Sequence, residues 1–289
     1  MALNIPVFRT RALSALIFVA VMLAGLLYNH WSFLVLFTII HFGCWHEYLR
    51  LIEKIEGVFL SLYIRLGLML MGFGLMLSFC GRAYQIGGYG LKENFFLPVS
   101  LAGFLLLVIG ILQKKASISP KVLGLACLGW LYISLSWGMM LGLRQEGMAF
   151  KGDLLFVDLG IIYPLTLIAA IWINDTLAYL VGSFIGKTPF SKISPKKTWE
   201  GTAGGAILCV LTVGLYFYLR VNHPYEGFII AGIAAVVGTA GDLLESKIKR
   251  LAGVKDSGAM LPGHGGFMDR FDSLLLATPF VWIVVKLFF

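Results

Sequence analysis

The sequence predicts an all-α fold, a polytopic integral membrane helix bundle. Hydrophobic residues make up 59% of its 289 positions and charged residues only 13%. The mean hydropathy of +0.88 lies far above that of soluble globular chains. A soluble protein of this size would need more polar side chains to cover its surface. The same composition excludes collagen-like, disordered and disulfide-rich secreted chains.

About nine apolar segments reach the length of roughly 20 residues that crosses a bilayer, with polar or Gly-rich breaks between them. They cover residues 12–29, 31–49, 58–80, 95–112, 122–143, 158–182, 203–221, 227–242 and 272–289. The first segment follows Arg9 and Arg11, as a signal peptide would. No small-x-small cleavage site precedes the second segment, so we expect the first to be retained.

Lysine and arginine are distributed unevenly among the loops. If the N-terminus is cytoplasmic, most of the 23 basic residues fall on the cytoplasmic side, as the positive-inside rule requires. We therefore expect a cytoplasmic N-terminus and, because nine is odd, a C-terminus on the other side. The net charge of +8 then needs no nucleic acid as a partner. The lack of a targeting segment favours a bacterial plasma membrane, the inner membrane.

Polar residues concentrate in the C-terminal part of the chain. Residues 1–157 are predicted to form an N-terminal scaffold of transmembrane helices with short loops. Residues 158–289 contain the predicted cytoplasmic loops 183–202 and 243–271, where we expect the catalytic chemistry. Four single cysteines lie in apolar runs, which is typical of core residues and not of zinc sites or disulfides: Cys44, Cys80, Cys127 and Cys209.

The first polar motif lies inside the apolar segment 158–182. A carboxylate near the centre of a spanning helix costs roughly 3 kcal/mol, so Asp175 indicates a site within the bundle. Asn174 precedes it, and Tyr179 and Gly182 follow on the same helical face. The alternative is a packing face with one satisfied polar group.

The second motif is a basic loop at residues 191–202 that leads into the seventh apolar segment. Adjacent lysines interleaved with hydroxyl groups suit a polyphosphate, because both kinds of side chain donate to phosphate oxygens. The candidate substrate-binding residues of this loop are Ser194, Lys196, Lys197 and Glu200. A juxtamembrane cluster that merely follows the positive-inside rule is the open alternative.

The third motif begins where the eighth apolar segment ends. If the helix continues, Asp242, Glu245, Ser246 and Lys249 share one face, and Arg250 follows. An exposed face stabilised by ion pairs would have the same pattern.

The fourth motif is a Gly-rich turn at residues 255–272 that opens the last apolar segment. Its glycines would let the backbone approach a ligand closely. Its candidate residues are Lys255, Asp256, His264, Gly265, Gly266, Asp269, Arg270 and Asp272.

Four aspartates lie in or beside the cytoplasmic ends of three segments, so a bundle can bring them into one polar pocket: Asp175, Asp242, Asp269 and Asp272. Carboxylates of this kind suit Mg²⁺, which is held by one or two carboxylates together with waters and substrate phosphates. We predict a Mg²⁺ site here, with a second cation left open, and lysines that neutralise the phosphates.

Residues 246–272 resemble the signature of the phosphatidate cytidylyltransferases, also called CDP-diacylglycerol synthases. The 12 specified positions are Ser246, Lys249, Arg250, Lys255, Asp256, Pro262, His264, Gly265, Gly266, Asp269, Arg270 and Asp272. The resemblance extends to the elements at residues 174–182, 194–201 and 241–246, whereas the N-terminal half is similar only as a run of apolar helices.

The resemblance implies a Mg²⁺-dependent reaction of phospholipid biosynthesis, in which CTP and phosphatidic acid give CDP-diacylglycerol and pyrophosphate. The implied partners are CTP, phosphatidic acid and membrane lipids, and a homodimer is kept as an expectation. The catalytic candidates are Asp242, Asp269, Asp272, His264 and Lys249, and the metal ligands would come from Asp242, Asp269, Asp272 and Asp175. The other candidates, for substrate binding, are Asn174, Tyr179, Ser194, Lys196, Lys197, Glu200, Ser246, Arg250, Lys255, Asp256, Gly265, Gly266 and Arg270.

The role of His264 and three rival functions remain open, one of them a structural or lipid-binding membrane protein with an inactivated site. A lipid phosphate with a second pKa near 6 needs no general base, so we expect His264 to donate a hydrogen bond to phosphate or leaving pyrophosphate. A structural role in the Gly-rich turn is its alternative. An enzyme that uses CTP with another lipid acceptor, or a cation-coupled transporter with Asp175 as its ion site, would each retain part of this pattern.

Overall fold

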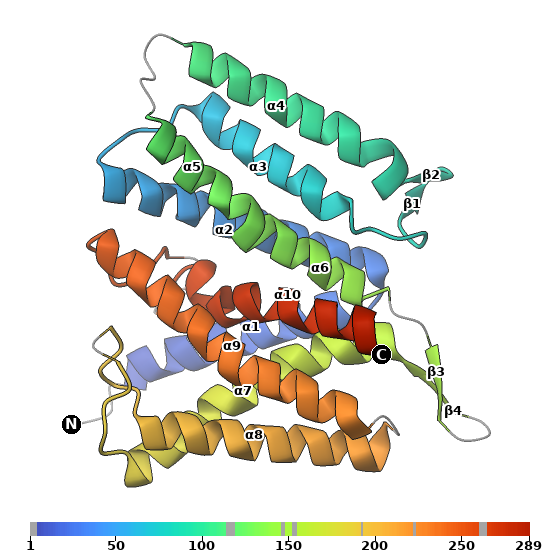
Figure 1. The fold of residues 1–289 in the computed structure, drawn as a ribbon, viewed down its shortest axis with the longest axis vertical. Helices are drawn as coiled ribbons and strands as arrows, with labels where there is room; N and C mark the ends of the chain where they lie inside the picture. The colour runs from blue at the N-terminus through green and yellow to red at the C-terminus, as the bar shows by residue number, and fades with distance from the viewer. Residues whose placement is uncertain are drawn as a thin grey trace. The chain divides into compact units, whose positions relative to one another are not determined.

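The computed structural model describes residues 5–113, 119–145, 148–151, 155–191, 193–221, 224–259 and 265–289. The described residues form helices apart from loops and two short antiparallel hairpins (Figure 1). The helical character predicted from the sequence is therefore confirmed.

The chain folds into two compact units, and each is described here by itself. Unit 1 comprises Met1–Leu141 and Ile248–Phe271, and unit 2 comprises Gly142–Lys247 and Asp272–Phe289. Two helices, α9 (Pro224–Leu251) and α10 (Met268–Phe288), contribute residues to both units. Most of the Gly-rich turn therefore belongs to the same unit as the N-terminal helices.

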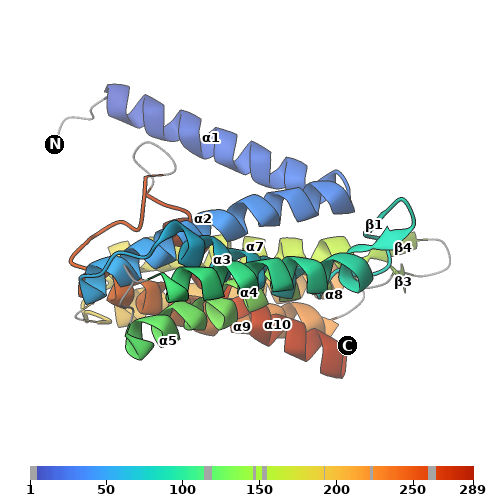
Figure 2. The ribbon, with the colours of Figure 1, turned by 90° about the horizontal axis from the view of Figure 1, so that it is seen from above.

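Unit 1 is built on helices whose starts are capped by side chains. Asn29 caps α2, Ser61 caps α3 and Ser119 caps α5, each accepting a hydrogen bond from the first helical turn. Helices α1 and α2 are close at the Asn29 connection and diverge away from it (Figure 2). The elements are α1 (Ile5–Leu27), α2 (His30–Glu56), α3 (Leu62–Leu77), β1 (Gln85–Ile86), β2 (Tyr89–Gly90), the π-helix η1 (Leu91–Phe95), α4 (Phe96–Leu112), α5 (Pro120–Gly129), the π-helix η2 (Trp130–Ser134) and most of α6 (Leu135–Leu143).

Glycines and aromatic side chains hold unit 1 together. A Cβ atom at Gly67 of α3 would lie 2.6 Å from the backbone nitrogen of Leu107 in α4, so only glycine permits this close approach. The core of the unit contains the fully buried rings of Trp45 and Trp137. The Ser134 hydroxyl of η2 accepts a hydrogen bond from the Trp45 indole at 2.9 Å, which satisfies a polar group inside the bundle.

Unit 2 contains four long helices and a hairpin. Asp158 caps α7 and Thr198 caps α8, and α7 contains an internal proline, Pro164. The elements are β3 (Met148–Lys151), β4 (Leu155–Asp158), α7 (Leu159–Ile185), α8 (Trp199–Arg220) and the parts of α9 and α10 that belong to this unit.

Small residues bring the helices of unit 2 into close contact. A Cβ at Gly205 of α8 would lie 2.6 Å from the backbone nitrogen of Ala178 in α7, and one at Gly201 would meet Gly182 at 2.8 Å. Helices α7 and α8 therefore approach each other closely at Gly182. A Cβ at Gly241 of α9 would lie 2.6 Å from the carbonyl oxygen of Asp272 in α10, so α9 and α10 also approach closely beside two predicted site residues.

Each of the nine apolar segments overlaps a helical stretch, but the ends differ from those predicted. Helix α9 continues to Leu251, α8 begins at Trp199 and α10 begins at Met268. The loops between these helices are therefore shorter than the predicted 183–202 and 243–271, because polar caps extend helices beyond their apolar cores. Among the described residues, six helices are long and apolar enough to cross a membrane, and Leu13–Leu27 and Leu62–Leu77 are shorter apolar helices. The total of nine spans and the cytoplasmic N-terminus stay predictions.

Candidate functional site

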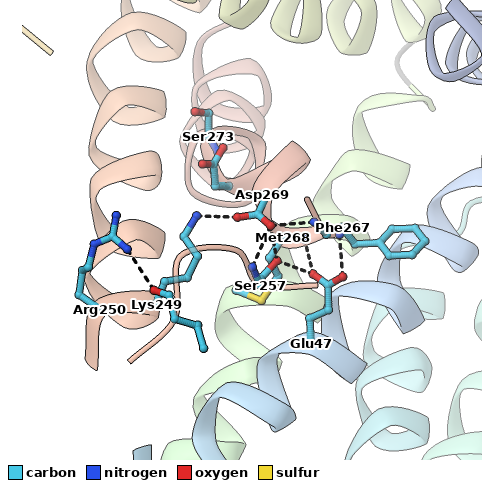
Figure 3. A network of polar contacts seen from close by, with 11 residues as sticks. Glu47, Lys249, Arg250, Ser257, Phe267, Met268, Asp269 and Ser273 are labelled. Atoms are coloured by element: carbon cyan, nitrogen blue, oxygen red, sulfur yellow. Dashed lines mark hydrogen bonds and ion pairs between the residues drawn. The ribbon is translucent and has the colours of Figure 1, made fainter. Parts of the chain in front are cut away.

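The first polar cluster lies in unit 1, where the segment after α9 meets the start of α10 (Figure 3). We call it the Glu47–Asp269 network, and its side chains are Glu47, Lys249, Ser257 and Asp269. Lys249 stands on the last turn of α9, Asp269 on the first turn of α10 and Glu47 on α2.

Asp269 is surrounded by hydrogen-bond donors. Its Oδ1 accepts from the Lys249 ammonium at 2.5 Å. Its Oδ2 accepts from the backbone N–H of Gly266 at 2.7 Å and from that of Ser257 at 2.9 Å. The Lys249 and Asp269 side chains are only 11% and 10% exposed, so this is a largely buried ion pair. A buried ion pair of this kind depends on such extra hydrogen bonds to offset the cost of desolvation.

Glu47 provides the second carboxylate of the network. Its Oε1 accepts from the backbone N–H of Phe267 and its Oε2 from that of Met268, both at 2.9 Å. The Ser257 hydroxyl oxygen lies 2.7 Å from Glu47 Oε2 and 2.9 Å from Asp269 Oδ2, so its single proton serves one carboxylate at a time. Glu47 is 5% exposed, and these donors compensate for its burial.

Glycines allow the backbone to approach these carboxylates. Gly265 has a φ of +76°, a conformation that disfavours other residues, and a Cβ there would lie 2.6 Å from Asp269 Oδ2. A Cβ at Gly266 would lie 2.3 Å from both carboxylate oxygens of Glu47. The backbone at Gly265 and Gly266 thus comes close to the protein's own carboxylates, and the predicted close approach to a ligand stays a prediction.

The second polar cluster lies in unit 2, where α9 packs at Gly241 against Asp272 near the start of α10. We call it the carboxylate cluster, and it consists of Asp175, Asp242, Glu245 and Asp272. The side chains of Asp242 and Asp272 are within hydrogen-bonding reach of each other. Glu245 is fully buried one turn after Asp242 and interacts electrostatically with Asp272. Since α9 is helical through this segment, the expected shared face of Asp242 and Glu245 is confirmed.

Lys197 supplies positive charge to the carboxylate cluster. Its ammonium forms an ion pair with Asp242, with side chains 30% and 25% exposed. On α7, Asp175 interacts with both Lys197 and Asp242 and is hydrogen-bonded by Asn174. Asn174 is 4% exposed, and among the described residues its Oδ1 has no hydrogen-bond partner. The structure therefore brings together residues from all four sequence motifs.

Glu200 organises the loop before α8. Its carboxylate accepts hydrogen bonds from the backbone N–H groups of Lys187 and Thr188 and from the Thr188 hydroxyl. The antiparallel bridge between Pro189 and Thr198 closes the same loop. This arrangement accounts for Glu200 without a substrate, and its predicted substrate contact stays a prediction.

The remaining predicted residues lie around the two clusters. On α7, Tyr179 is 75% exposed. Lys196, Arg250, Lys255, Asp256 and Arg270 are exposed, whereas Ser194 and Ser246 are half-buried. Arg250 donates to the carbonyl oxygen of Val254 at 3.1 Å. His264, like Pro262, lies outside the described residues, so its predicted role stays a prediction.

Three residues of the two clusters were not among the site residues predicted from the sequence: Glu47, Ser257 and Glu245. For Glu47 a signal existed, because it is a carboxylate inside the apolar segment 31–49 and the argument applied to Asp175 applies equally to it. Ser257 carried no signal of its own, since its role depends on two side chains distant in sequence.

The carboxylate cluster suits a divalent cation. Among the described residues, no group of three or more His, Cys, Asp or Glu side chains has the spacing of a metal site. A pair of carboxylates is nevertheless the usual protein contribution to a Mg²⁺ site, the other ligands being waters and phosphates. Asp242 and Asp272 form such a pair, and the negative charge around them exceeds what Lys197 neutralises.

The apolar helices, six of them long enough to cross a bilayer among the described residues, define a multi-pass membrane protein, and each unit contains one polar cluster. The chain belongs to the cytidylyltransferase family, whose sequence profile matches residues 9–288.

Individual relatives share this assignment. Over 207 residues, the chain is 34% identical to phosphatidate cytidylyltransferase 4, chloroplastic, of Arabidopsis thaliana, covering 67% of this chain and 53% of the relative. It is 44% identical over 125 residues to phosphatidate cytidylyltransferase of Aquifex aeolicus, covering 43% and 47%. It is 32% identical over 195 residues to phosphatidate cytidylyltransferase of Bacillus subtilis, covering 66% and 69%. The chain thus spans about half the length of the first two relatives.

Proposed function

We propose that this chain transfers CMP from CTP to phosphatidic acid, giving CDP-diacylglycerol and pyrophosphate. The observation that carries the proposal is the Asp242–Asp272 carboxylate pair beside Lys197, in a chain of the cytidylyltransferase family. The names of the relatives supply the acceptor, phosphatidate.

The reaction joins two anions, so electrostatic stabilisation is the main demand on the protein. At neutral pH the phosphate of phosphatidic acid is largely a dianion, because its second pKa is near 6. One of its oxygens attacks the α-phosphorus of CTP, the bond from that phosphorus to the β-phosphate oxygen breaks, and pyrophosphate leaves. No proton has to be removed from the nucleophile.

Asp242 and Asp272 would hold Mg²⁺, with Asp175 as a further ligand. When bound, the cation supplies positive charge to the phosphate oxygens of CTP. Lys197 adds an ammonium group beside the same carboxylates. Lys196, exposed on the same loop, is the next candidate for contact with the phosphates.

Asp269 and Lys249 differ from the Asp242–Asp272 pair because they already form an ion pair with each other. They are paired with each other, so Lys249 contacts a phosphate and Asp269 contacts a cation only if that pair opens. Their catalytic roles are therefore conditional on a rearrangement that the carboxylate pair does not need.

The membrane setting follows from the substrates. Phosphatidic acid keeps its acyl chains in hydrocarbon and presents its phosphate at the interface, where CTP arrives from water. We propose nine spans, a cytoplasmic N-terminus and a bacterial inner-membrane location. A C-terminal alkaline phosphatase fusion expressed in a bacterium should be active and a C-terminal green fluorescent protein fusion dark, and the opposite pattern would contradict the nine-span topology.

The activity is tested by transfer of label from [α-³²P]CTP into organic-extractable lipid by the purified chain in detergent. We expect label only when phosphatidic acid and Mg²⁺ are both present. Transfer to polyprenyl phosphate but not to phosphatidic acid would favour the other-acceptor alternative. No transfer to any lipid from a folded preparation would refute the proposal and favour a transporter.

A further inference from the structure

The first turn of α10 is anchored on α2, a helix that the sequence assigned to the scaffold. Glu47 of α2 accepts hydrogen bonds from the N–H groups of Phe267 and Met268. Gly43, one turn earlier on α2, leaves room for the Phe267 ring, since a Cβ there would lie 2.5 Å from it. Phe271 packs against Phe18 and Trp137, with ring centroids 5.9 and 5.7 Å apart. Two independent kinds of contact therefore hold this turn.

The position of Glu47 suits a carboxylate for electrostatic reasons. The first N–H groups of a helix lack partners within the helix and carry the positive end of its dipole. A buried carboxylate that accepts two of these N–H groups satisfies both requirements. The ordinary alternative, an apolar residue in this apolar segment, would leave the Phe267 and Met268 N–H groups without this acceptor.

Ser257 connects Glu47 to Asp269. Its hydroxyl oxygen is within hydrogen-bonding distance of both carboxylates, and its backbone N–H donates to Asp269 at 2.9 Å. Asp269 in turn holds the Lys249 ammonium. A chain of direct contacts thus runs from α2 through Ser257 to the Lys249–Asp269 pair (Figure 3).

We propose that Glu47 is a positioning residue for the transfer reaction, setting the start of α10 and, through Ser257, the orientation of Asp269 and Lys249. The catalytic part of this inference rests on the proposed function. The structural part, that Glu47 holds the turn at residues 265–271, stands by itself.

The test compares Glu47→Gln with a matched control, Glu56→Gln. Glutamine has nearly the volume of glutamate, but an NH₂ group replaces one of the two carboxylate oxygens. Where that oxygen accepted a hydrogen bond from a backbone N–H or from the Ser257 hydroxyl, the NH₂ group cannot accept one. Glu56 lies on the same helix and pairs with Lys121, away from the network, so its substitution should leave turnover unchanged. Both chains are measured in detergent for hydrogen exchange, for thermal midpoint, and for kcat and KM with CTP and phosphatidic acid.

For Glu47→Gln we expect faster exchange confined to residues 265–271. We also expect kcat to fall about 10- to 100-fold, the range seen when residues that orient a site are removed, with KM for phosphatidic acid within about threefold of the original. The lipid KM should hold because the network consists of largely buried polar side chains, which offer no apolar surface to acyl chains.

Ser257→Ala is the second variant, and it keeps the inference testable if Glu47→Gln does not fold. It removes the hydroxyl link without unpairing the two backbone N–H groups, so we expect a folded chain with a smaller fall in kcat. In the double variant the two losses should be less than additive in free energy, because both interrupt one chain of contacts.

Three results would overturn the inference. The first is turnover of Glu47→Gln or Ser257→Ala within twofold of the original chain. The second is hydrogen exchange in Glu47→Gln that is unchanged at residues 265–271. The third is faster exchange in Glu47→Gln spread evenly over unit 1, which indicates a purely structural role. A wild-type chain that transfers no label refutes the proposed activity instead. The comparison of hydrogen exchange between Glu47→Gln and the wild-type chain still decides whether Glu47 holds the start of α10.

Discussion

The Glu47–Asp269 network and the carboxylate cluster are both rich in acidic residues, yet their charges are balanced differently. In the network, Glu47 and Asp269 accept hydrogen bonds from backbone N–H groups, and Lys249 is paired with Asp269. In the cluster, Asp242 and Asp272 face each other with Glu245 and Asp175 nearby, and Lys197 pairs with Asp242.

This difference separates carboxylates that accept hydrogen bonds from the protein from carboxylates that face one another. A carboxylate whose oxygens are filled by protein donors stabilises the fold and is not ready to bind a cation. Carboxylates that face one another repel, and a cation or a proton relieves the repulsion. We therefore expect substitutions in the two clusters to have opposite effects on stability.

The largest expected effect is loss of activity in Asp242→Asn and Asp272→Asn. Each should lower CMP transfer by about a thousandfold or more, because charge stabilisation of the reacting phosphates is the main catalytic demand. The thermal midpoint should stay the same or rise, since a repulsive charge is removed. The measurements are label transfer and thermal unfolding in detergent. A marked fall in the midpoint for both variants would show that the cluster is a structural network as well.

Asp269→Asn should instead destabilise the protein. It removes the carboxylate charge that faces the Lys249 ammonium in a largely buried position, and breaking such a pair costs about 3 to 5 kcal/mol. Denaturant or thermal unfolding measures this loss. Lys249→Met with Asp269→Asn should recover part of the stability, because the ammonium charge that faced Asp269 is removed as well. If Asp269→Asn alone is as stable as the original chain, the expected contrast between the two clusters is contradicted.

Lys197→Met should raise KM for CTP by roughly 10- to 100-fold, since a charge-assisted contact is worth about 1.5 to 3 kcal/mol. Lys187→Met is the matched control, because Lys187 is an exposed lysine on the same loop. Steady-state kinetics with varied CTP decides the outcome. Equal effects of the two substitutions would indicate a general response to loop charge.

The smallest effect is a shift of the thermal midpoint by Mg²⁺. A ligand at 100 times its Kd stabilises a protein by about 2.7 kcal/mol, so adding Mg²⁺ after treatment with a chelator should raise the midpoint by a few degrees. The shift should disappear in Asp272→Asn and persist in Asp269→Asn. If it persists in Asp272→Asn and disappears in Asp269→Asn, the cation belongs to the Glu47–Asp269 network.

Local patterns in the sequence were sufficient to predict the helices and to select several residues that the fold brings into the two polar clusters. Apolar length predicts helices, and the expected shared face of Asp242 and Glu245 depends only on helical periodicity. The approach of α7 and α8 at Gly182 likewise follows from small residues at helical spacing. Helix ends were predicted less well, because caps such as Thr198 extend a helix beyond its apolar core.

Tertiary structure decided how each carboxylate is used. The sequence placed Asp242, Asp269 and Asp272 in one class of metal ligands, whereas the fold surrounds Asp269 with donors and leaves Asp242 and Asp272 facing each other. Glu47 lies more than two hundred residues from its partners Phe267 and Met268. Hydrogen bonding and charge balance depend on which groups meet in space, so they are determined by packing between distant segments rather than by local pattern.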